Sequence, residues 1–138
     1  MEINLDKDTK DFCTHKKHRR PVSHEKEEHM IQSAIRMLIP SKKSGEVLKI
    51  VGSVVELCRD DPGCLSCHIY RDLQEENVFM LEQVWRSEED LTLHLRTDEY
   101  RNLLLVLELA LKQPEIRFDT ISSSTGIETI EKARSHAR

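Results

Sequence analysis

Two hydrophobic periodicities alternate along residues 30–121, and their order restricts the chain to few folds. Residues 30–39 place apolar or small side chains at every second position, the period of a β-strand, and Pro40 ends that pattern because proline cannot donate to a sheet ladder. Residues 44–59 change to helical spacing. Their apolar positions predict one stripe along a helix of about four turns: Val47, Val51, Val54, Val55 and Cys58.

The next segment predicts a hairpin. Asp60–Gly63 has turn composition, and it precedes a strand over 65–71 and a second strand over 78–85, with a polar turn between them at 72–77.

Two short helices and a last strand complete the pattern. Ser87 has Asp90 three positions later, as in a capping box, and Thr97 is placed to cap a second helix. Pro114 precedes a fourth strand over 116–121. In the helix that Thr97 is expected to cap, the apolar positions expected to face the core are Leu103, Leu104, Leu107, Ala110 and Leu111.

The resulting order, β-α-β-β-α-β, predicts a ferredoxin-like α+β fold with a four-stranded antiparallel sheet and helices on one face. The first strand has apolar residues on both sides, with Ile35 and Met37 on one face and Ala34 and Leu38 on the other. We therefore expect the second face to be covered as well. Two copies packed sheet to sheet, as a homodimeric α/β barrel, would cover it.

Composition divides the chain into three parts. Residues 1–29 hold seven acids, seven Lys or Arg, and His15, His18, His24 and His29, with few large apolar side chains. We expect a disordered tail there, although its histidines could bind metal and its basic cluster could contact an acidic partner. Residues 30–130 form the expected folded domain, and residues 131–138 a C-terminal tail.

Charge and hydropathy exclude some classes of function. The net charge is −4, which gives no electrostatic reason to expect nucleic acid. The longest apolar run is Leu103–Leu107, far shorter than the roughly 20 residues that cross a bilayer. Charged residues interrupt the first dozen positions, where a signal peptide would need an apolar core. We expect a cytoplasmic protein with neither nucleic acid nor membrane as a partner.

The four cysteines are Cys13, Cys58, Cys64 and Cys67. Free thiols are the default in a reducing compartment. Cys64 and Cys67 have the two-residue gap of zinc sites and redox motifs, but no second pair has matching spacing, and the pair enters a strand instead of opening a helix. Ordinary buried thiols are therefore the favoured interpretation over a metal or redox role.

Several stretches resemble the antibiotic biosynthesis monooxygenase family, which includes small quinol monooxygenases. They are Asp61–Ser66, Ile69–Asp72, Trp85–Leu95 with its histidine nine positions after the tryptophan, and Pro114–Phe118. The resemblance covers about residues 31–130. It implies a dimeric α+β barrel with a pocket between the sheet and the helices. It also implies oxidation of electron-rich aromatics by dioxygen, with no metal, flavin or haem.

The resemblance also selects the candidate site residues. His94 matches the family's histidine, and an imidazole can accept a phenolic proton near neutral pH, although a buried histidine bonded to a backbone carbonyl is the alternative. Trp85 could stack on a flat substrate or only pack. Tyr70 could position a substrate oxygen or pair across strands. Gln83 stands where the family commonly has a glutamate, while Glu82 is expected on the opposite face.

Two hypotheses follow. The first is an oxidoreductase: a cofactor-independent monooxygenase that acts on a quinol or another electron-rich aromatic small molecule, with His94 as base and with Trp85, Tyr70 and Gln83 binding the substrate. The second is a non-catalytic module with the same fold, which Gln83 and the non-aromatic Cys67 favour. Haem degradation is unsupported, because the position ten residues after His94, where that related branch has its haem ligand, is Leu104.

Overall fold

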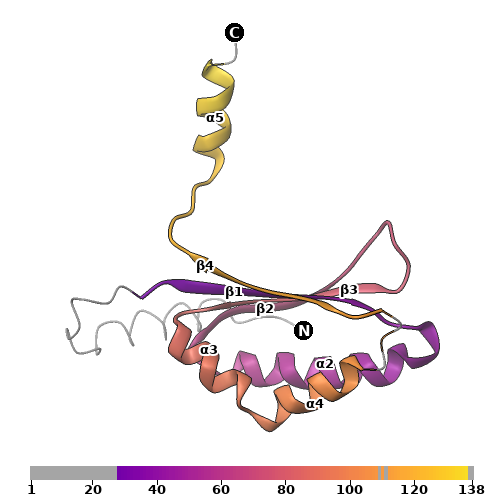
Figure 1. Cartoon of the computed structure of the whole chain (residues 1–138). Coiled ribbons are helices and arrows are strands. Elements are labelled where there is room, and N and C mark those ends of the chain that lie inside the picture. Colours follow the sequence, from indigo (N-terminus) through magenta and orange to yellow (C-terminus); the bar gives the residue numbers. More distant parts are fainter. Residues whose placement is uncertain (1–27, 109, 111, 137–138) are drawn as a thin grey trace.

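The computed structural model describes residues 28–108, 110 and 112–136, and its elements follow the predicted order (Figure 1). The predicted N-terminal tail lies almost entirely outside these residues. The elements are β1 (Met30–Leu38), the 3-10 turn η1 (Ser41–Lys43), α2 (Ser44–Arg59), β2 (Cys64–Arg71), β3 (Val78–Trp85), α3 (Glu88–Leu95), α4 (Asp98–Leu107), β4 (Glu115–Ile121) and α5 (Ile127–His136).

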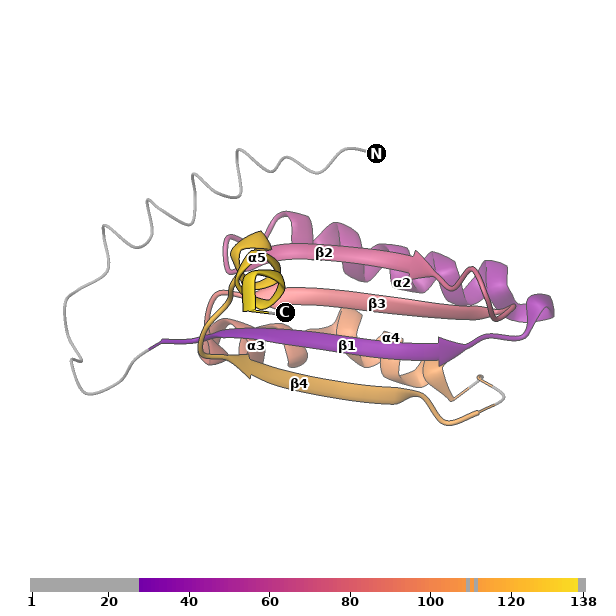
Figure 2. The same ribbon diagram turned by 90° about the horizontal axis from the view of Figure 1, so that it is seen from above.

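The four strands form one antiparallel sheet in the order β2-β3-β1-β4, with α2, α3 and α4 on one face (Figures 1 and 2). This is the ferredoxin-like α+β fold that the sequence predicts. Because paired residues point to the same side of a sheet, the register defines rows across it. The row that matters most below is Cys67, Gln83, Ser33 and Phe118 on the helix side.

The core lies between this sheet and the helices. All five positions of the predicted α2 stripe are buried, which confirms that stripe. The α4 prediction is wrong in part. Leu103 and Leu107 are buried, but Leu104 is 46% exposed and Ala110 lies beyond the end of the helix. A run of five apolar residues surrounds the whole helix, so only the side facing α2 and the sheet is covered. Leu111 lies outside the described residues.

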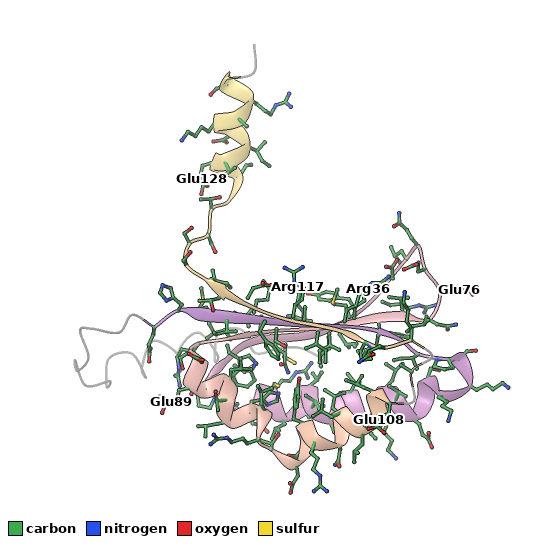
Figure 3. The ribbon with its side chains drawn as sticks, viewed as in Figure 1. Arg36, Glu76, Glu89, Glu108, Arg117 and Glu128 are labelled. Carbon is green, nitrogen blue, oxygen red and sulfur yellow. The ribbon has the colours of Figure 1, made fainter. Side chains whose placement is uncertain are left out.

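The other face of the sheet is open in the single chain, and it is more polar than the sequence analysis expected. Figure 3 shows Arg36 and Arg117 pointing away from the helices on this face. Their neighbours include Glu82 and Asp119, and these side chains surround a hollow of about 330 Å³. The expectation of an apolar outer face holds only in part, because the side chains around this hollow include Ala34 and Met80 beside the charged ones.

The last element, α5, extends from the sheet on the side opposite α2, α3 and α4 (Figure 1). Its described side chains are exposed, including Ile127 at 67% and Ile130 at 57%. Among the described residues, no helix has the length and apolar character needed to cross a membrane.

Candidate functional site

A tight corner after β3 positions α3 beneath the sheet. The Ser87 hydroxyl caps α3 by accepting from the Asp90 backbone N–H at 3.2 Å, and the Asp90 carboxylate accepts from Ser87 Oγ and Arg86 Nε, both at 2.8 Å. The Arg86 backbone N–H also donates to the Gly63 carbonyl at 2.8 Å. These bonds fix the direction in which α3 leaves the end of β3, and α3 then places His94 below the sheet.

The His94 imidazole lies between two aromatic rings. Its centroid is 4.6 Å from that of Trp85, with the planes tilted by 31°, and 5.3 Å from that of Tyr100 in an edge-on arrangement. Only 2% of His94 and none of Trp85 is exposed. The sequence-based interpretation that brings Trp85 and His94 together therefore matches where the structure places them.

Gln83 favours one tautomer of this imidazole. Trp85 Nε1 donates to Gln83 Oε1 at 3.3 Å, which places the amide nitrogen on the side of His94. Gln83 Nε2 lies 3.4 Å from His94 Nε2. An amide nitrogen can only donate, so a hydrogen bond at this contact makes His94 Nε2 the acceptor and assigns the ring proton to Nδ1.

The electrostatic surroundings keep His94 neutral. Burial lowers the pKa of His94 below its ordinary value, because the charged imidazolium loses its hydration. Negative charge on Cys67, Asp61 and Glu99 opposes part of this shift. A neutral ring with an unprotonated Nε2 can accept a proton from a phenol.

Two thiols share the same amide. Gln83 Nε2 donates to Cys58 Sγ at 3.1 Å and lies 3.6 Å from Cys67 Sγ. Cys58 and Tyr100 were missed as neighbours of His94 by the sequence analysis. Cys58 belongs to the predicted apolar stripe of α2, which could have placed it against the strands that carry Cys67 and Gln83.

Tyr70 is not part of this cluster. Tyr70 pairs with Met80, two residues along β2 from the pair of His68 and Glu82, and lies on the same open face of the sheet. It is 49% exposed. Its ring packs at 5.9 Å from that of His68. The even spacing between Tyr70 and Cys64 is broken by a β-bulge at Cys64/Ser66, and Cys67, not Tyr70, shares the helix side with Gln83.

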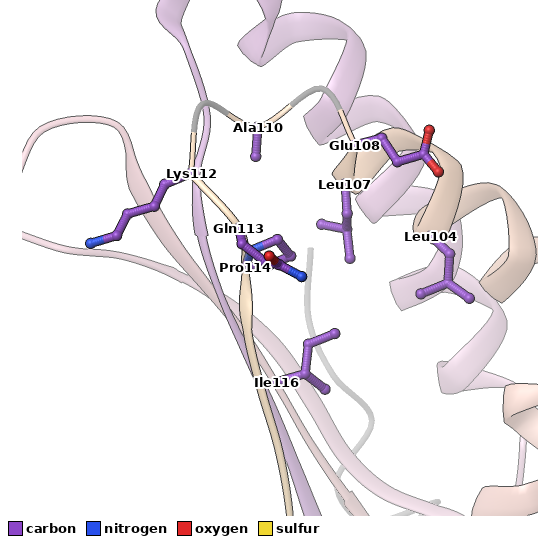
Figure 4. A pocket seen from close by; sticks show the side chains of 8 residues that line it. All are labelled: Leu104, Leu107, Glu108, Ala110, Lys112, Gln113, Pro114 and Ile116. Atoms are coloured by element: carbon purple, nitrogen blue, oxygen red, sulfur yellow. The ribbon is translucent and has the colours of Figure 1, made fainter.

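An apolar groove opens at the other end of the helix layer. It has a volume of about 400 Å³ and lies between the end of α4 and β4 (Figure 4). Leu104, Leu107, Pro114 and Ile116 contribute its apolar walls. Helices α2 and α4 do not cover β4, so Ile116 and Phe118 on its helix side remain 41% and 46% exposed.

Residues 28–136, apart from the two positions that are not described, contain no group of three or more His, Cys, Asp or Glu side chains arranged to hold a metal ion.

Comparison with known proteins agrees with this fold. An uncharacterised protein of Synechocystis sp. is 32% identical over 65 residues, a match that covers 47% of this chain and less than half, 44%, of that protein. A conserved protein of Methanosarcina mazei superposes with a TM-score of 0.62 at 22% identity, over 67% of this chain and 92% of that one. A Caulobacter crescentus protein proposed to be an antibiotic biosynthesis monooxygenase superposes with a TM-score of 0.63 at 20% identity, over 70% of this chain and 92% of that one.

These two structures, both below 25% identity, show the fold. The family itself is shown by the sequence: the model of the family described as antibiotic biosynthesis monooxygenase matches residues 30–104, more than half of the chain. The chain therefore belongs to the antibiotic biosynthesis monooxygenase family.

Proposed function

We propose that this protein is a monooxygenase that oxidises a quinol or another electron-rich aromatic small molecule with dioxygen, and that it does so without a bound cofactor. His94 is the proposed base. Trp85 and Gln83 are the proposed substrate-binding residues, and Tyr70, on the other face, is left out of this role.

One observation supports the proposal most directly: His94 Nε2 lies 3.4 Å from the donor nitrogen of Gln83, in buried, aromatic surroundings. A base of this kind can take the proton of a phenol without competition from water. The anion formed is more electron-rich than the phenol and reduces dioxygen more readily. The substrate then supplies the electrons, so that one oxygen atom enters the ring and the other leaves as water.

The substrate must reach a buried imidazole, and the uncovered strand β4 offers a route. Phe118, Ser33 and Gln83 lie in one row on the helix side of the sheet. Phe118 is exposed, Ser33 is small, and Gln83 contacts His94. We place the entry of a flat substrate along this row, with Phe118 at its mouth.

The proposal includes a homodimer in the cytoplasm. The open face of the sheet carries both Arg36 and Arg117 as well as Glu82 and Asp119, so a twofold-related copy could pair opposite charges across it. Light scattering coupled to size exclusion measures the mass in solution, and a monomer at micromolar concentration would contradict this assembly. Three free thiols in the described residues fit the reducing conditions of the cytoplasm.

Oxygen consumption with a panel of hydroquinones tests the activity. With ¹⁸O₂, we expect one labelled atom in the quinone product and the other in water. His94→Gln should lower kcat by at least ~100-fold, the usual contribution of a general base. His68→Gln is the matched control, because His68 lies on the open face beside Tyr70. Turnover that survives His94→Gln would remove His94 from the mechanism.

A second candidate function is a binding module without turnover. The contacts of His94 with Trp85, Tyr100 and Gln83 are also those of a well-packed core histidine, and the amide of Gln83 is not a carboxylate. Binding of the same hydroquinones that quenches Trp85 fluorescence, with no oxygen uptake across the panel, would favour this function over the first.

A further inference from the structure

Three buried thiols lie near the N-terminal end of β2. Cys58 comes from the end of α2, and Cys64 and Cys67 come from β2; their exposed fractions are 1%, 3% and 4%. Cys58 and Cys67 share the Gln83 amide nitrogen, with their sulfur atoms 3.1 Å and 3.6 Å from it. The sequence analysis considered only Cys64 with Cys67, because the folded chain was needed to bring Cys58 to them.

The three thiols are not equivalent. The Cys64 thiol donates to the Ser66 carbonyl at 3.3 Å, beside the bulge in β2. The neighbouring Cys58 and Cys64 thiols lower the pKa of Cys67, and the Gln83 amide acts in the same direction. Interactions with Cys64 and Cys67, together with burial, raise the pKa of Cys58. Cys67 is therefore the thiol that ionises first, and Cys58 keeps its proton.

We propose that Cys58 and Cys67 form a redox-active pair, which a small hydroperoxide converts to a disulfide. The Cys67 thiolate attacks one peroxide oxygen, the O–O bond breaks, and with hydrogen peroxide the second oxygen leaves as water after taking up a proton. The products of this step are the Cys67 sulfenic acid and water. The Cys58 sulfur then attacks the Cys67 sulfur, and the sulfenic oxygen leaves as a second water with the Cys58 proton. Both cysteines are oxidised by one electron each, and the peroxide is reduced by two.

Burial selects the class of oxidant. Only 4% of Cys67 is exposed, which excludes a peptide disulfide and favours an oxidant as small as hydrogen peroxide. Strand β2 is at the edge of the sheet, so Cys67 is covered on that side by no further strand of the described sheet. This chemistry uses the thiols alone and does not depend on the proposed monooxygenase activity.

The fluorescence of Trp85 can report the oxidation of this cysteine pair. Trp85, the single tryptophan, donates to Gln83, and Gln83 donates to Cys58. A disulfide replaces the Cys58 thiol and removes the charge of Cys67, so the surroundings of the indole change. We expect the fluorescence of Trp85 to shift with oxidation and to return with a thiol reductant.

The test uses the full-length chain with Cys13→Ser, so that the three clustered thiols are the only ones present. Hydrogen peroxide should lower the intact mass by about 2 Da, the loss of two hydrogens, and dithiothreitol should reverse it. Peptide mapping of this protein should find Cys58 joined to Cys67. A bond between any other pair, or no bond in the folded protein, would overturn the proposal.

Three serine variants assign the roles. Cys58→Ser should leave a sulfenic acid on Cys67 that dimedone traps, Cys67→Ser should abolish the reaction, and Cys64→Ser should still form the disulfide. Circular dichroism verifies that each variant is folded, and the mapping experiment above stands without them. Equal peroxide reactivity of Cys67→Ser and its parent would exclude Cys67 as the reacting thiol.

Discussion

The imidazole of His94 lies against the indole of Trp85, with ring centroids 4.6 Å apart, and both side chains are buried beneath the sheet. The two residues are separated by the corner at Ser87, which caps α3 and directs it back under β3. A histidine that the fold buries in this way must remain neutral to keep its contacts. Its titration is therefore linked to the stability of the whole domain.

Unfolding experiments across pH should detect this linkage. Burial lowers the pKa of His94 in the folded state, so below the ordinary histidine value of 6.5 the unfolded chain binds more protons than the folded one. The free energy of unfolding should then fall as the pH drops from about 6.5 toward the lower folded pKa, at up to about 1.4 kcal/mol per pH unit for one proton. Urea titrations between pH 5 and 8, roughly the histidine range, measure this slope.

His94→Gln should lose that part of the slope, whereas His68→Gln should retain it. Identical pH profiles for the wild-type protein and His94→Gln would show that the imidazole titrates as freely in the folded state as in the unfolded one.

Much of the fold follows from the sequence because its elements are encoded locally. The five-residue stripe of α2, the alternation of β1 and the cap at Ser87 each depend on residues that are neighbours along the chain. The prediction that Leu104 faces the core was wrong, because an apolar run does not show which side of a helix meets the core.

The site was harder to predict because it joins separate elements. The contact between Trp85 and His94 lies within ten residues, and the family resemblance located it. The contact between Cys58 and Gln83 depends on how α2 crosses the sheet. The placement of Tyr70 depends on a bulge in β2, which changes the face of every residue beyond it and leaves no mark in the alternation pattern.

Gly63 is expected to be intolerant of any side chain. A Cβ at this position would lie 2.6 Å from Asp90 Cγ, and the Asp90 carboxylate is held by Ser87 and Arg86. Gly63→Ala should therefore reduce the free energy of unfolding by about 1–3 kcal/mol, the usual cost of overpacking. Denaturant unfolding at neutral pH measures it.

Gly52→Ala is the matched control. A Cβ at Gly52 would meet no atom within 4 Å, and the residue lies inside α2. This substitution should be stabilising by about 0.5–1 kcal/mol, because alanine is the better helix former. A Gly63→Ala protein as stable as the parent would mean that Asp90 can leave its cap at little cost.

The amide of Gln83 should set the proton affinity of His94. Gln83 Nε2 lies 3.4 Å from His94 Nε2, so Gln83→Glu would place a carboxylate beside the ring and favour its charged form. We expect the pKa of His94 to rise by about 1–3 units, as measured by NMR titration of the imidazole Hε1 resonance. Glu82→Gln is the control, because Glu82 pairs with Ala34 and His68 on the open face and its charge is separated from His94 by the sheet. If Gln83→Glu left the titration of His94 unchanged while the protein stayed folded, the new carboxyl would have to be protonated or turned away. The close arrangement of Gln83 and His94 described above would then be incorrect.

If the pKa of His94 rises as expected in Gln83→Glu, the pH dependence of oxygen uptake with the hydroquinone panel should move in the same direction, since protonation of His94 Nε2 removes the proposed base.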